Sequence, residues 1–150
     1  IRAGGRIWQS PRIQYTFICR DNIGRLFKQY FQYGFWKTRV IQKHGMPASI
    51  RHLVPGVFVS SLMFLTLTSP FSGLARTGLL GIVAFYATVI VAASMWICRK
   101  PTLWKYLPIL PFILSTFHIA YGFGFLKGVW DFIILGKHKR GGIQESTLSR

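Results

Sequence analysis

Residues 21–51 read DNIGRLFKQYFQYGFWKTRVIQKHGMPASIR, and this basic, aromatic stretch stands directly before the first long uncharged segment of the chain. At helical period, residues spaced three or four apart share a face. One such face holds Arg25, Gln29, Gln32, Trp36, Arg39 and Lys43. The other side holds mainly Ile23, Phe27, Tyr30, Phe31, Gly34 and Ile41. Asp21 or Asn22 can cap the start, and Gly45 followed by Pro47 ends the helix. The pattern predicts an amphipathic helix that lies flat where lipid headgroups meet acyl chains.

Beyond this stretch, three segments contain no Lys, Arg, Asp or Glu: Leu53 to Ala75, Thr77 to Cys98 and Tyr106 to Leu126. Each meets the requirement of about 20 mostly apolar residues for crossing the hydrocarbon core of a bilayer. Soluble cores rarely contain three such segments in succession. We therefore expect a mainly α-helical integral membrane protein, in which the basic interfacial helix is followed by about three transmembrane helices.

The charge of the chain is strongly one-sided, with 19 Lys and Arg against 3 Asp and Glu and a formal net charge of +16. Ten of the 19 cations precede His52 and so lie ahead of the first apolar segment. Cations beside transmembrane segments are typical of a cytoplasmic face that meets anionic lipid. A nucleic-acid-binding protein would spread such an excess over a soluble fold, so we expect membrane lipid and no nucleic acid as the partner.

The chain divides into four regions. Residues 1–20 resemble the edge of a larger domain, with a helix stop at Ala3-Gly4-Gly5 and two short alternating strands at 6–9 and 13–17. Residues 21–52 form the interfacial helix and its linker, 53–135 the transmembrane region, and 136–150 a disordered tail. Because two short strands are not stable alone, we expect the chain to be a C-terminal fragment.

The cations also predict a topology. If the basic leader is cytoplasmic, the turn at Pro70–Thr77 lies outside with Arg76, and Arg99, Lys100 and Lys105 return inside. The third segment has two solutions. We favour three crossings followed by a final interfacial helix. In the alternative, Tyr121-Gly122-Phe123-Gly124 breaks the segment and 129–135 dips back, so that the tail ends inside.

Small residues suggest where helices approach closely. In the second apolar segment they are Gly81, Ala84, Ala87, Ala92 and Ala93, which permit tight packing in lipid. The Tyr121-Gly122-x-Gly124 sequence is interpreted as a packing notch. Cys19 and Cys98 show no metal-ligand spacing and are expected to be reduced, and His44 and His52 do not form a ligand pair. We predict no metal site in this chain.

Three strings carry a resemblance to a known family: AGGRIWQSP, LFKQYFQYGFWKTRVIQKHG and RHLVPGVFV, followed late in the chain by HIAYGFGFLKG. Together they resemble the C-terminal membrane portion of bacterial family 2 glycosyltransferases, and are most similar to the succinoglycan-biosynthesis type. The resemblance covers the chain from Ile1 to about Leu135. The QYFQYGFWK and AYGFGFLKG strings are its most specific parts.

This resemblance implies a preceding catalytic domain of the GT-A type, a doubly wound α/β fold that binds a nucleotide sugar with a divalent cation, Mg or Mn. It implies inverting transfer of a hexose to a polyprenyl-linked acceptor in exopolysaccharide synthesis, at the cytoplasmic face of the bacterial inner membrane. The catalytic carboxylates of that family are absent from these 150 residues. The chain alone is therefore not expected to catalyse a reaction, and no cofactor is expected within it.

The resemblance also singles out Gln32 to Trp36, which matches the Gln-x-x-Arg-Trp pattern of membrane-bound members except that Phe35 replaces Arg. Trp36 offers a ring for stacking on a sugar face and Gln32 an amide for hydroxyls, so both are candidates for acceptor binding. Equally, Trp36 can be an interfacial anchor. The missing Arg removes a bidentate phosphate clamp and favours a non-processive transferase over a polymer synthase.

The remaining candidates are charged. Five cations can contact lipid or phosphate: Arg25, Lys28, Lys37, Arg39 and Lys43. The general interpretation is attraction to anionic lipid, and the more specific hypothesis is selective binding of a polyprenyl diphosphate. His118 is polar within an apolar segment, where it either serves function or bonds to a neighbouring helix carbonyl. The rival function is a non-catalytic polytopic membrane anchor or assembly subunit. A transporter is disfavoured because few polar residues lie within the spans.

Overall fold

The computed structural model describes residues 22–46 and 49–136. The described chain is helical throughout and contains no strand. Its elements are α1 (Ile23–His44), the 3₁₀ turn η1 (Ile50–His52), α2 (Val54–Thr68), α3 (Gly73–Ile97), the 3₁₀ turn η2 (Pro101–Tyr106), α4 (Leu110–Gly128) and the π-helix η3 (Val129–Ile134). The strands predicted at 6–9 and 13–17, Cys19 and the predicted disordered tail lie outside the described residues.

Helix α1 begins and ends where the sequence predicts. The Asn22 side chain accepts a hydrogen bond from the Gly24 backbone N–H at 2.7 Å, which satisfies one of the free donors of the first turn. At the other end, Gly45 adopts a left-handed conformation with φ of +70°. Residues with a Cβ resist that conformation, so glycine stops the helix there.

Helices α2 and α3 form a hairpin whose turn is shorter than predicted. Pro55 lies in the first turn of α2, where its missing N–H is not needed, and it introduces no break. The Ser72 hydroxyl accepts from the Ala75 backbone N–H at 3.4 Å and caps α3. Helix α3 therefore starts at Gly73, and Arg76 lies in its first turn. The prediction of a turn extending through Thr77 is wrong, because the Ser72 cap starts the helix earlier.

Helix α4 runs without interruption through Tyr121-Gly122-Phe123-Gly124. The alternative in which these residues break the segment is therefore wrong. Their glycines are contact points: a Cβ added at Gly122 would meet Val59 and the Pro55 carbonyl of α2. The interpretation of this sequence as a packing notch is confirmed. After Gly128 the helix widens into η3, which ends before Gly136 at φ of +57°.

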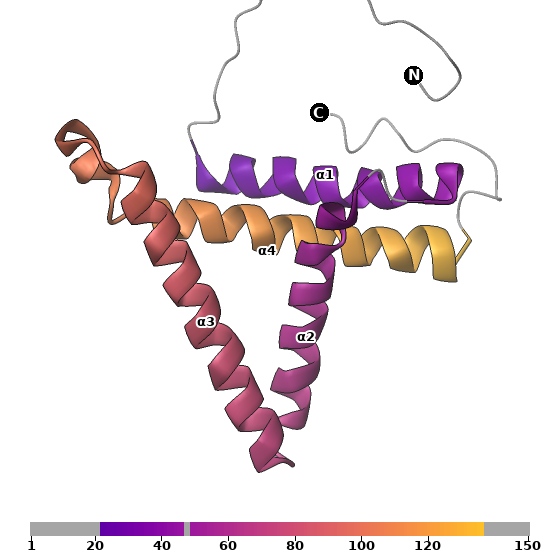
Figure 1. The fold of residues 1–150 in the computed structure, drawn as a ribbon. Coiled ribbons are helices and arrows are strands. Elements are labelled where there is room, and N and C mark those ends of the chain that lie inside the picture. Colours follow the sequence, from indigo (N-terminus) through magenta and orange to yellow (C-terminus); the bar gives the residue numbers. More distant parts are fainter. Residues whose placement is uncertain (1–21, 47–48, 137–150) are drawn as a thin grey trace, which may run out of the picture.

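The helices form two crossed layers (Figure 1). Helices α2 and α3 form a V that closes at the turn between them. Helix α4 runs across the open end of the V, and α1 lies along α4 on the side away from the tip of the V. Helix α1 contacts α4 more extensively than any other two elements contact each other, and α2 also packs on α4.

The contact between α1 and α4 is parallel and close. Tyr30 stacks on Phe117 with ring centroids 4.2 Å apart near the start of the contact, and Gln42 donates to the Phe132 carbonyl at 2.8 Å near its end. Between these points glycines remove the side chain that would separate the helices: a Cβ at Gly124 would overlap the Phe31 carbonyl.

Two further small residues extend this contact. A Cβ at Gly34 would overlap the Tyr121 carbonyl, and one at Gly128 would lie 2.8 Å from the Phe35 carbonyl. The Thr38 hydroxyl, which is 1% exposed, donates to the Phe125 carbonyl at 3.1 Å. Small-xxx-small spacing at Gly34–Thr38 and Gly124–Gly128 thus brings the two backbones together.

The second apolar segment behaves differently. Gly81, Ala84, Ala87 and Ala92 are exposed on α3, and a Cβ at Gly81 would meet nothing within 4 Å. Within the described residues, the prediction that small residues mediate close packing is therefore not met at these four positions, and Ala93 is partly buried. The reason is geometric, since α3 meets α2 near the turn and then diverges from it (Figure 1).

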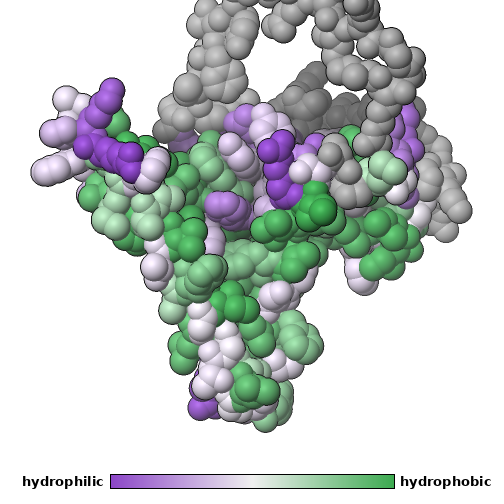
Figure 2. All heavy atoms as spheres, viewed as in Figure 1, coloured by the Kyte–Doolittle hydropathy of each residue, from purple (hydrophilic) through white to green (hydrophobic). Residues whose placement is uncertain are grey.

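Most of the large apolar side chains point outward rather than into a core. Val57, Phe64 and Leu67 on α2 are 63%, 65% and 71% exposed, and Phe85 on α3 is 73% exposed. Figure 2 shows hydrophobic residues over the V and hydrophilic ones along its open end. Three helical segments are long and apolar enough to cross a membrane: Ile50–Thr68, Gly73–Ile97 and Leu110–Ile134. This confirms the predicted mainly helical fold with three membrane-capable helices.

We predict that Gly124→Ala separates α1 from α4, because its Cβ overlaps the Phe31 carbonyl. Overpacking of this kind costs about 1–3 kcal/mol. Gly81→Ala is the matched control, since it adds the same methyl group to a helical glycine that contacts nothing. Unfolding in detergent micelles should show a lower free energy for Gly124→Ala and an unchanged or higher one for Gly81→Ala. Equal stability of the two variants would contradict the contact.

Candidate functional site

The candidate site is the outer face of α1, which we call the basic face and define by Arg25, Gln29, Gln32, Trp36, Arg39 and Lys43. These residues lie opposite the side that contacts α4 through Phe31, Gly34 and Thr38. Because successive members are three or four residues apart, they form a row along the helix. The structure thus places the predicted acceptor-binding and lipid-contacting residues on one element.

Trp36 lies at the centre of a ring cluster. Its indole is 36% exposed and meets the Phe35 ring edge-on, with centroids 5.3 Å apart and an interplanar angle of 82°. The Phe132 ring of η3 lies 6.2 Å away and is tilted by 32°. Edge-to-face rings hold each other in a fixed orientation. The exposed part of the indole is therefore presented from a supported position.

Arg39 ties the same end of the basic face to η3. Its Nη1 donates to Gln42 Oε1 at 2.8 Å, and its guanidinium carbon lies 5.5 Å from the centroid of the Phe132 ring. Gln42 in turn donates from Nε2 to the Phe132 carbonyl. Sequence reasoning missed Gln42 and Phe132, because neither stands out by spacing. A guanidinium that is bonded at one end and lies over a ring is restricted in its orientation.

Phe35, the residue that replaces Arg in the Gln-x-x-Arg-Trp pattern, does not belong to the basic face. Its side chain is 8% exposed and its ring centroid lies 4.8 Å from that of Phe132. Its backbone carbonyl faces Gly128. Position 35 therefore lies against α4 through its backbone and against η3 through its ring, and Phe35 contributes packing between α1 and these two elements.

The cations are spread along the whole helix rather than gathered at one point. At a rise of 1.5 Å per residue, Arg25 and Lys43 lie about 27 Å apart along the axis. A diphosphate spans only a small fraction of that length, so at most a subset near one turn can contact a single headgroup. The full row matches an extended anionic surface.

His118 lies on α4, on the side that faces α3. Its Nδ1 is 3.0 Å from the Leu114 carbonyl and 3.3 Å from the Tyr86 hydroxyl of α3. A carbonyl only accepts, so Nδ1 carries the hydrogen, and the carbonyl belongs to the same helix rather than to a neighbouring one. The neighbouring helix supplies the Tyr86 hydroxyl instead.

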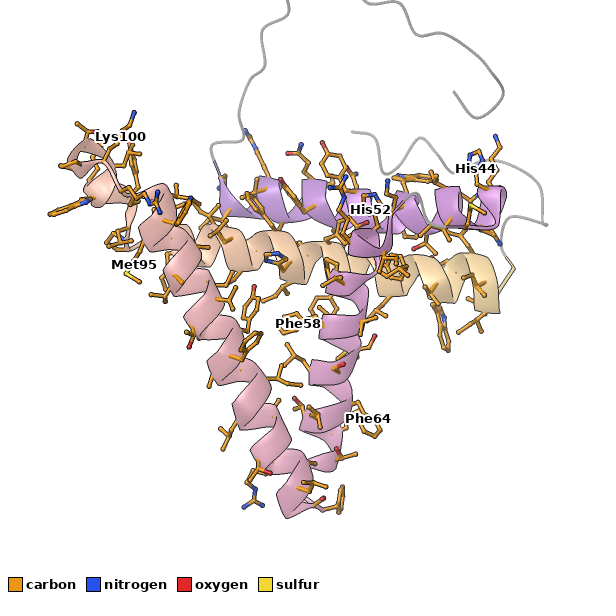
Figure 3. The ribbon with its side chains drawn as sticks, viewed as in Figure 1. His44, His52, Phe58, Phe64, Met95 and Lys100 are labelled. Carbon is orange, nitrogen blue, oxygen red and sulfur yellow. The ribbon has the colours of Figure 1, made fainter. Side chains whose placement is uncertain are left out.

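An apolar crevice of about 290 Å³ opens beside His118 between the arms of the V. Phe58 points into it from α2, whereas Phe64 points away (Figure 3). The Phe58 and Tyr86 ring centroids are 4.5 Å apart across the crevice. Its other lining residues include Val54, Ile82, Val89 and Ile90. The crevice can accommodate hydrocarbon, because its lining is apolar except for His118 and Tyr86, whose polar atoms are bonded to each other.

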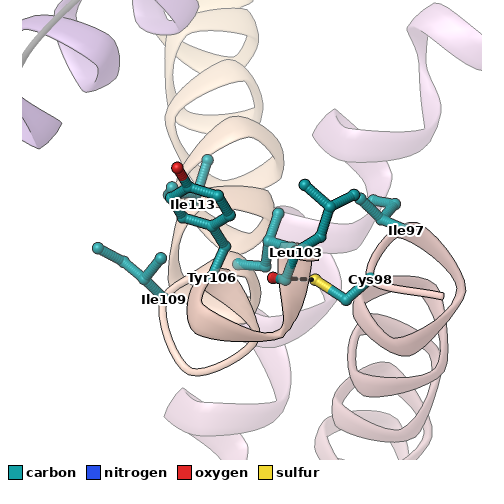
Figure 4. Close-up of a pocket in the computed structure, with 7 residues that line it drawn as sticks. Ile97, Cys98, Leu103, Tyr106, Ile109 and Ile113 are labelled. Carbon is teal, nitrogen blue, oxygen red and sulfur yellow. Dashed lines mark hydrogen bonds between the residues drawn. The ribbon is translucent and has the colours of Figure 1, made fainter. Parts of the chain in front are cut away.

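A second apolar crevice of about 220 Å³ lies where α3 meets η2 (Figure 4). Cys98, which is 2% exposed, donates from its thiol to the Leu103 carbonyl at 3.3 Å. The rest of the lining is formed by Ile97, Tyr106, Ile109, Leu110 and Ile113. The thiol is thus buried and bonded within its own turn.

The described residues do not fit the divalent cation that the resemblance implies for a preceding domain. Asp131 is the only carboxylate among residues 22–46 and 49–136. It is 6% exposed, and its Oδ2 lies 2.6 Å from the Lys127 ammonium. No group of three or more His, Cys, Asp or Glu side chains that could hold a metal occurs in this part of the chain. Holding Mg²⁺ on a diphosphate needs free carboxylate oxygens.

Comparison with known proteins finds one similar glycosyltransferase. The chain is 28% identical over 129 residues to a dolichyl N-acetyl-alpha-D-glucosaminyl phosphate 3-beta-D-2,3-diacetamido-2,3-dideoxy-beta-D-glucuronosyltransferase of Methanococcus voltae. The match covers 86% of this chain and 36% of that protein, so the chain spans about a third of the relative's length. No family model and no solved structure matches. The similarity supports glycosyl transfer in general and does not single out the succinoglycan type.

Restoring the arginine of the pattern tests where position 35 points. We predict that Phe35→Arg destabilises the chain by about 3 kcal/mol or more, because it places an unpaired charge against α4. Val40→Arg is the control, since Val40 is 46% exposed on the same helix and accepts a cation without burial. Chemical unfolding in detergent measures both variants. A stable Phe35→Arg would show that position 35 faces water instead.

Proposed function

We propose that this chain is the C-terminal membrane-anchoring part of a glycosyltransferase of family 2. The enzyme transfers a hexose from a nucleotide sugar to a lipid-linked acceptor in exopolysaccharide synthesis. The observation that carries this proposal is the similarity to the Methanococcus voltae transferase over 86% of the chain. That relative's name contains a dolichyl-linked phosphate, which is consistent with a lipid-linked acceptor. The resemblance of QYFQYGFWK and AYGFGFLKG to the succinoglycan type supports the finer assignment.

In this proposal the reacting carboxylates and the Mg²⁺ or Mn²⁺ ion belong to the preceding catalytic domain, and this chain presents the acceptor to it. Trp36 stacks on a sugar face of the acceptor, and Gln32 bonds to a sugar hydroxyl. The ring cluster of Phe35 and Phe132 supports this role, because it fixes the indole at the outer surface of α1. A sugar that is held in one orientation reacts faster than one that tumbles.

The cations of α1 attract the phosphate of the acceptor and the anionic leaflet around it. Each cation near such a surface contributes about 1 kcal/mol. Arg39 stands one turn from Trp36 and is held by Gln42, so it is the cation placed to contact a phosphate next to the stacked sugar. Arg25, Lys28, Lys37 and Lys43 then bind the surrounding lipid.

We place the protein in the bacterial inner membrane, with the basic face of α1 on the cytoplasmic side. The distribution of charge supports this orientation. Arg51, Arg99 and Lys100 belong to the open end of the V, whereas Arg76 lies at its tip. Cations are enriched on the cytoplasmic side of membrane segments. Nucleotide sugars are cytoplasmic substrates in this scheme, so the donor and α1 meet on the same side.

A second candidate is a non-catalytic membrane anchor or assembly subunit. The observation that favours it is the presence of three membrane-capable helices in the described residues, because anchoring requires only these helices. The two candidates differ in what accompanies the chain. An enzyme requires a catalytic domain on the same polypeptide, whereas an anchor functions without one.

Transfer in isolated membranes separates these candidates. Membranes from cells that express the longest reading frame containing this chain are given radiolabelled nucleotide hexoses, Mg²⁺ or Mn²⁺, and polyprenyl diphosphate sugars. We expect label to enter the solvent-extractable lipid fraction, and to be absent in membranes from cells with an empty vector. If no donor in the panel labels lipid while the protein is inserted, the transferase proposal is wrong and the anchor is favoured.

The role of Trp36 is tested in the same assay. We predict that Trp36→Ala lowers kcat/KM for the lipid acceptor about tenfold, which corresponds to the loss of one stacking contact of about 1.4 kcal/mol. The KM for the nucleotide sugar should not change. Trp104→Ala is the control, since Trp104 is 63% exposed on η2 and away from the basic face. Unchanged turnover of a normally inserted Trp36→Ala protein would remove the acceptor role.

A further inference from the structure

We propose that α4 lies along the membrane surface together with α1, although α4 is hydrophobic enough to cross the bilayer. The described part of the chain then crosses the membrane twice, through α2 and α3. Lipid is the partner of both helices: headgroups meet the basic face of α1, and acyl chains meet the face of α4 that lies away from α1. This inference concerns the membrane geometry of the chain and holds whether or not the protein transfers a sugar.

Helices α1 and α4 run in one direction and must lie at one depth in the membrane. Their contact runs from the Tyr30–Phe117 stack to the Gln42–Phe132 hydrogen bond, over about 18 Å of helix at 1.5 Å per residue. At Gly124 the backbones touch without an intervening side chain. Two helices in parallel contact over that length cannot have one across the bilayer and the other on its surface.

Helix α1 cannot cross the membrane. Between Ile23 and His44 it carries five cations and no acid, and the cations are distributed from the first turn to the last. Charged side chains at the centre of a bilayer are rare and are paired with one another when they occur. Three of these cations, Arg25, Arg39 and Lys43, belong to the basic face. A helix with such a face lies at the interface, where its cations remain in water and headgroups. Helix α4 is then held at that level by its contact with α1.

The layer formed by α1 and α4 differs in polarity between its two faces. Phe112 and Phe123 are 69% and 41% exposed and lie eleven residues apart, so they share a face of α4. The residues that contact α1, such as Phe117, Tyr121 and Gly124, recur at intervals of four and three on the opposite face. Trp130, 54% exposed, continues the outer row into η3. The layer is therefore cationic above and aromatic below.

Cations lie at the two ends of the V and are absent between them. Lys100 lies at the open end, at the level of His44 on α1, whereas Phe64 lies toward the tip (Figure 3). The tip carries Arg76 in the first turn of α3. Between these levels, α3 has 25 residues, or about 37 Å at 1.5 Å per residue, which exceeds the hydrocarbon core of about 30 Å. Helix α3 therefore has the length that a membrane crossing requires, and cations mark both ends of the V.

This geometry replaces both solutions that the sequence left open for the third segment. Helix α4 neither crosses nor breaks at its glycines. The Lys127–Asp131 pair, near the end of α4, stays at the same level as η2, which precedes α4. Residues 135 and 136 therefore emerge on the same side of the membrane as Trp104.

Cysteine accessibility tests this directly in the full chain. In a background with Cys19 and Cys98 replaced by alanine, single cysteines are introduced as Trp104→Cys, Leu135→Cys and Phe71→Cys, three exposed positions. A membrane-impermeant maleimide is applied to spheroplasts and, separately, to inverted membrane vesicles. Trp104→Cys and Leu135→Cys flank α4, and Phe71→Cys marks the tip of the V. Labelling after detergent treatment shows that each thiol can react.

We expect Trp104→Cys and Leu135→Cys to label from the same side and Phe71→Cys from the opposite one. If Leu135→Cys labels with Phe71→Cys, then α4 crosses the membrane and the proposal is wrong. If Leu135→Cys reacts only after detergent treatment, the end of α4 is sunk in the bilayer, and the proposal is again wrong. Phe71→Cys labelling with Trp104→Cys would show that the V does not cross, which also overturns it.

Discussion

The arrangement of this chain depends on the backbone contact between α1 and α4. In lipid, helices gain little by burying apolar surface against one another, so close van der Waals contact decides which of them associate. Gly34, Gly124 and Gly128 allow that contact, and Thr38 adds a hydrogen bond to the Phe125 carbonyl. Because α1 bears five cations, each costing about 2.5–3.5 kcal/mol at the centre of a membrane helix, the contact also sets the depth of α4.

The contact supports the candidate site from below. The rings of Phe35 and Phe132 lie between α1 and η3, and Trp36 and Arg39 are both held against Phe132. Phe132 is placed by the Gln42 hydrogen bond to its carbonyl. The outer face of α1 is therefore a supported surface rather than a single flexible helix. The proposed stacking of Trp36 on a sugar requires such support, because a binding group must be held in one orientation.

Much of this fold follows from the sequence, and the rest shows where sequence patterns stop being informative. The bounds of α1 follow from Asn22 and Gly45, and the three apolar helices follow from the uncharged segments. The glycines of α4 were open to two interpretations, because a glycine can either break a helix or admit a neighbour, and only the partner decides. The resemblance placed Phe35 within a motif but did not show that this residue packs against α4 and η3. The small residues Gly81, Ala84, Ala87 and Ala92 of α3 fit a packing pattern but are exposed in the described part of the chain.

The depth of α4 tests the central claim most directly. Single spin labels are placed at Phe112 and Phe123 on α4, at Trp130 on η3, and at Leu74, Phe85 and Trp96 on α3, all exposed side chains. The protein is reconstituted in bilayers, and the ratio of collisions with oxygen to collisions with a water-soluble nickel complex reports depth at each label. We predict one shallow depth at the three positions on α4 and η3 and, along α3, a maximum at Phe85. A depth maximum at Phe123, with Phe112 and Trp130 near opposite surfaces, would contradict the account.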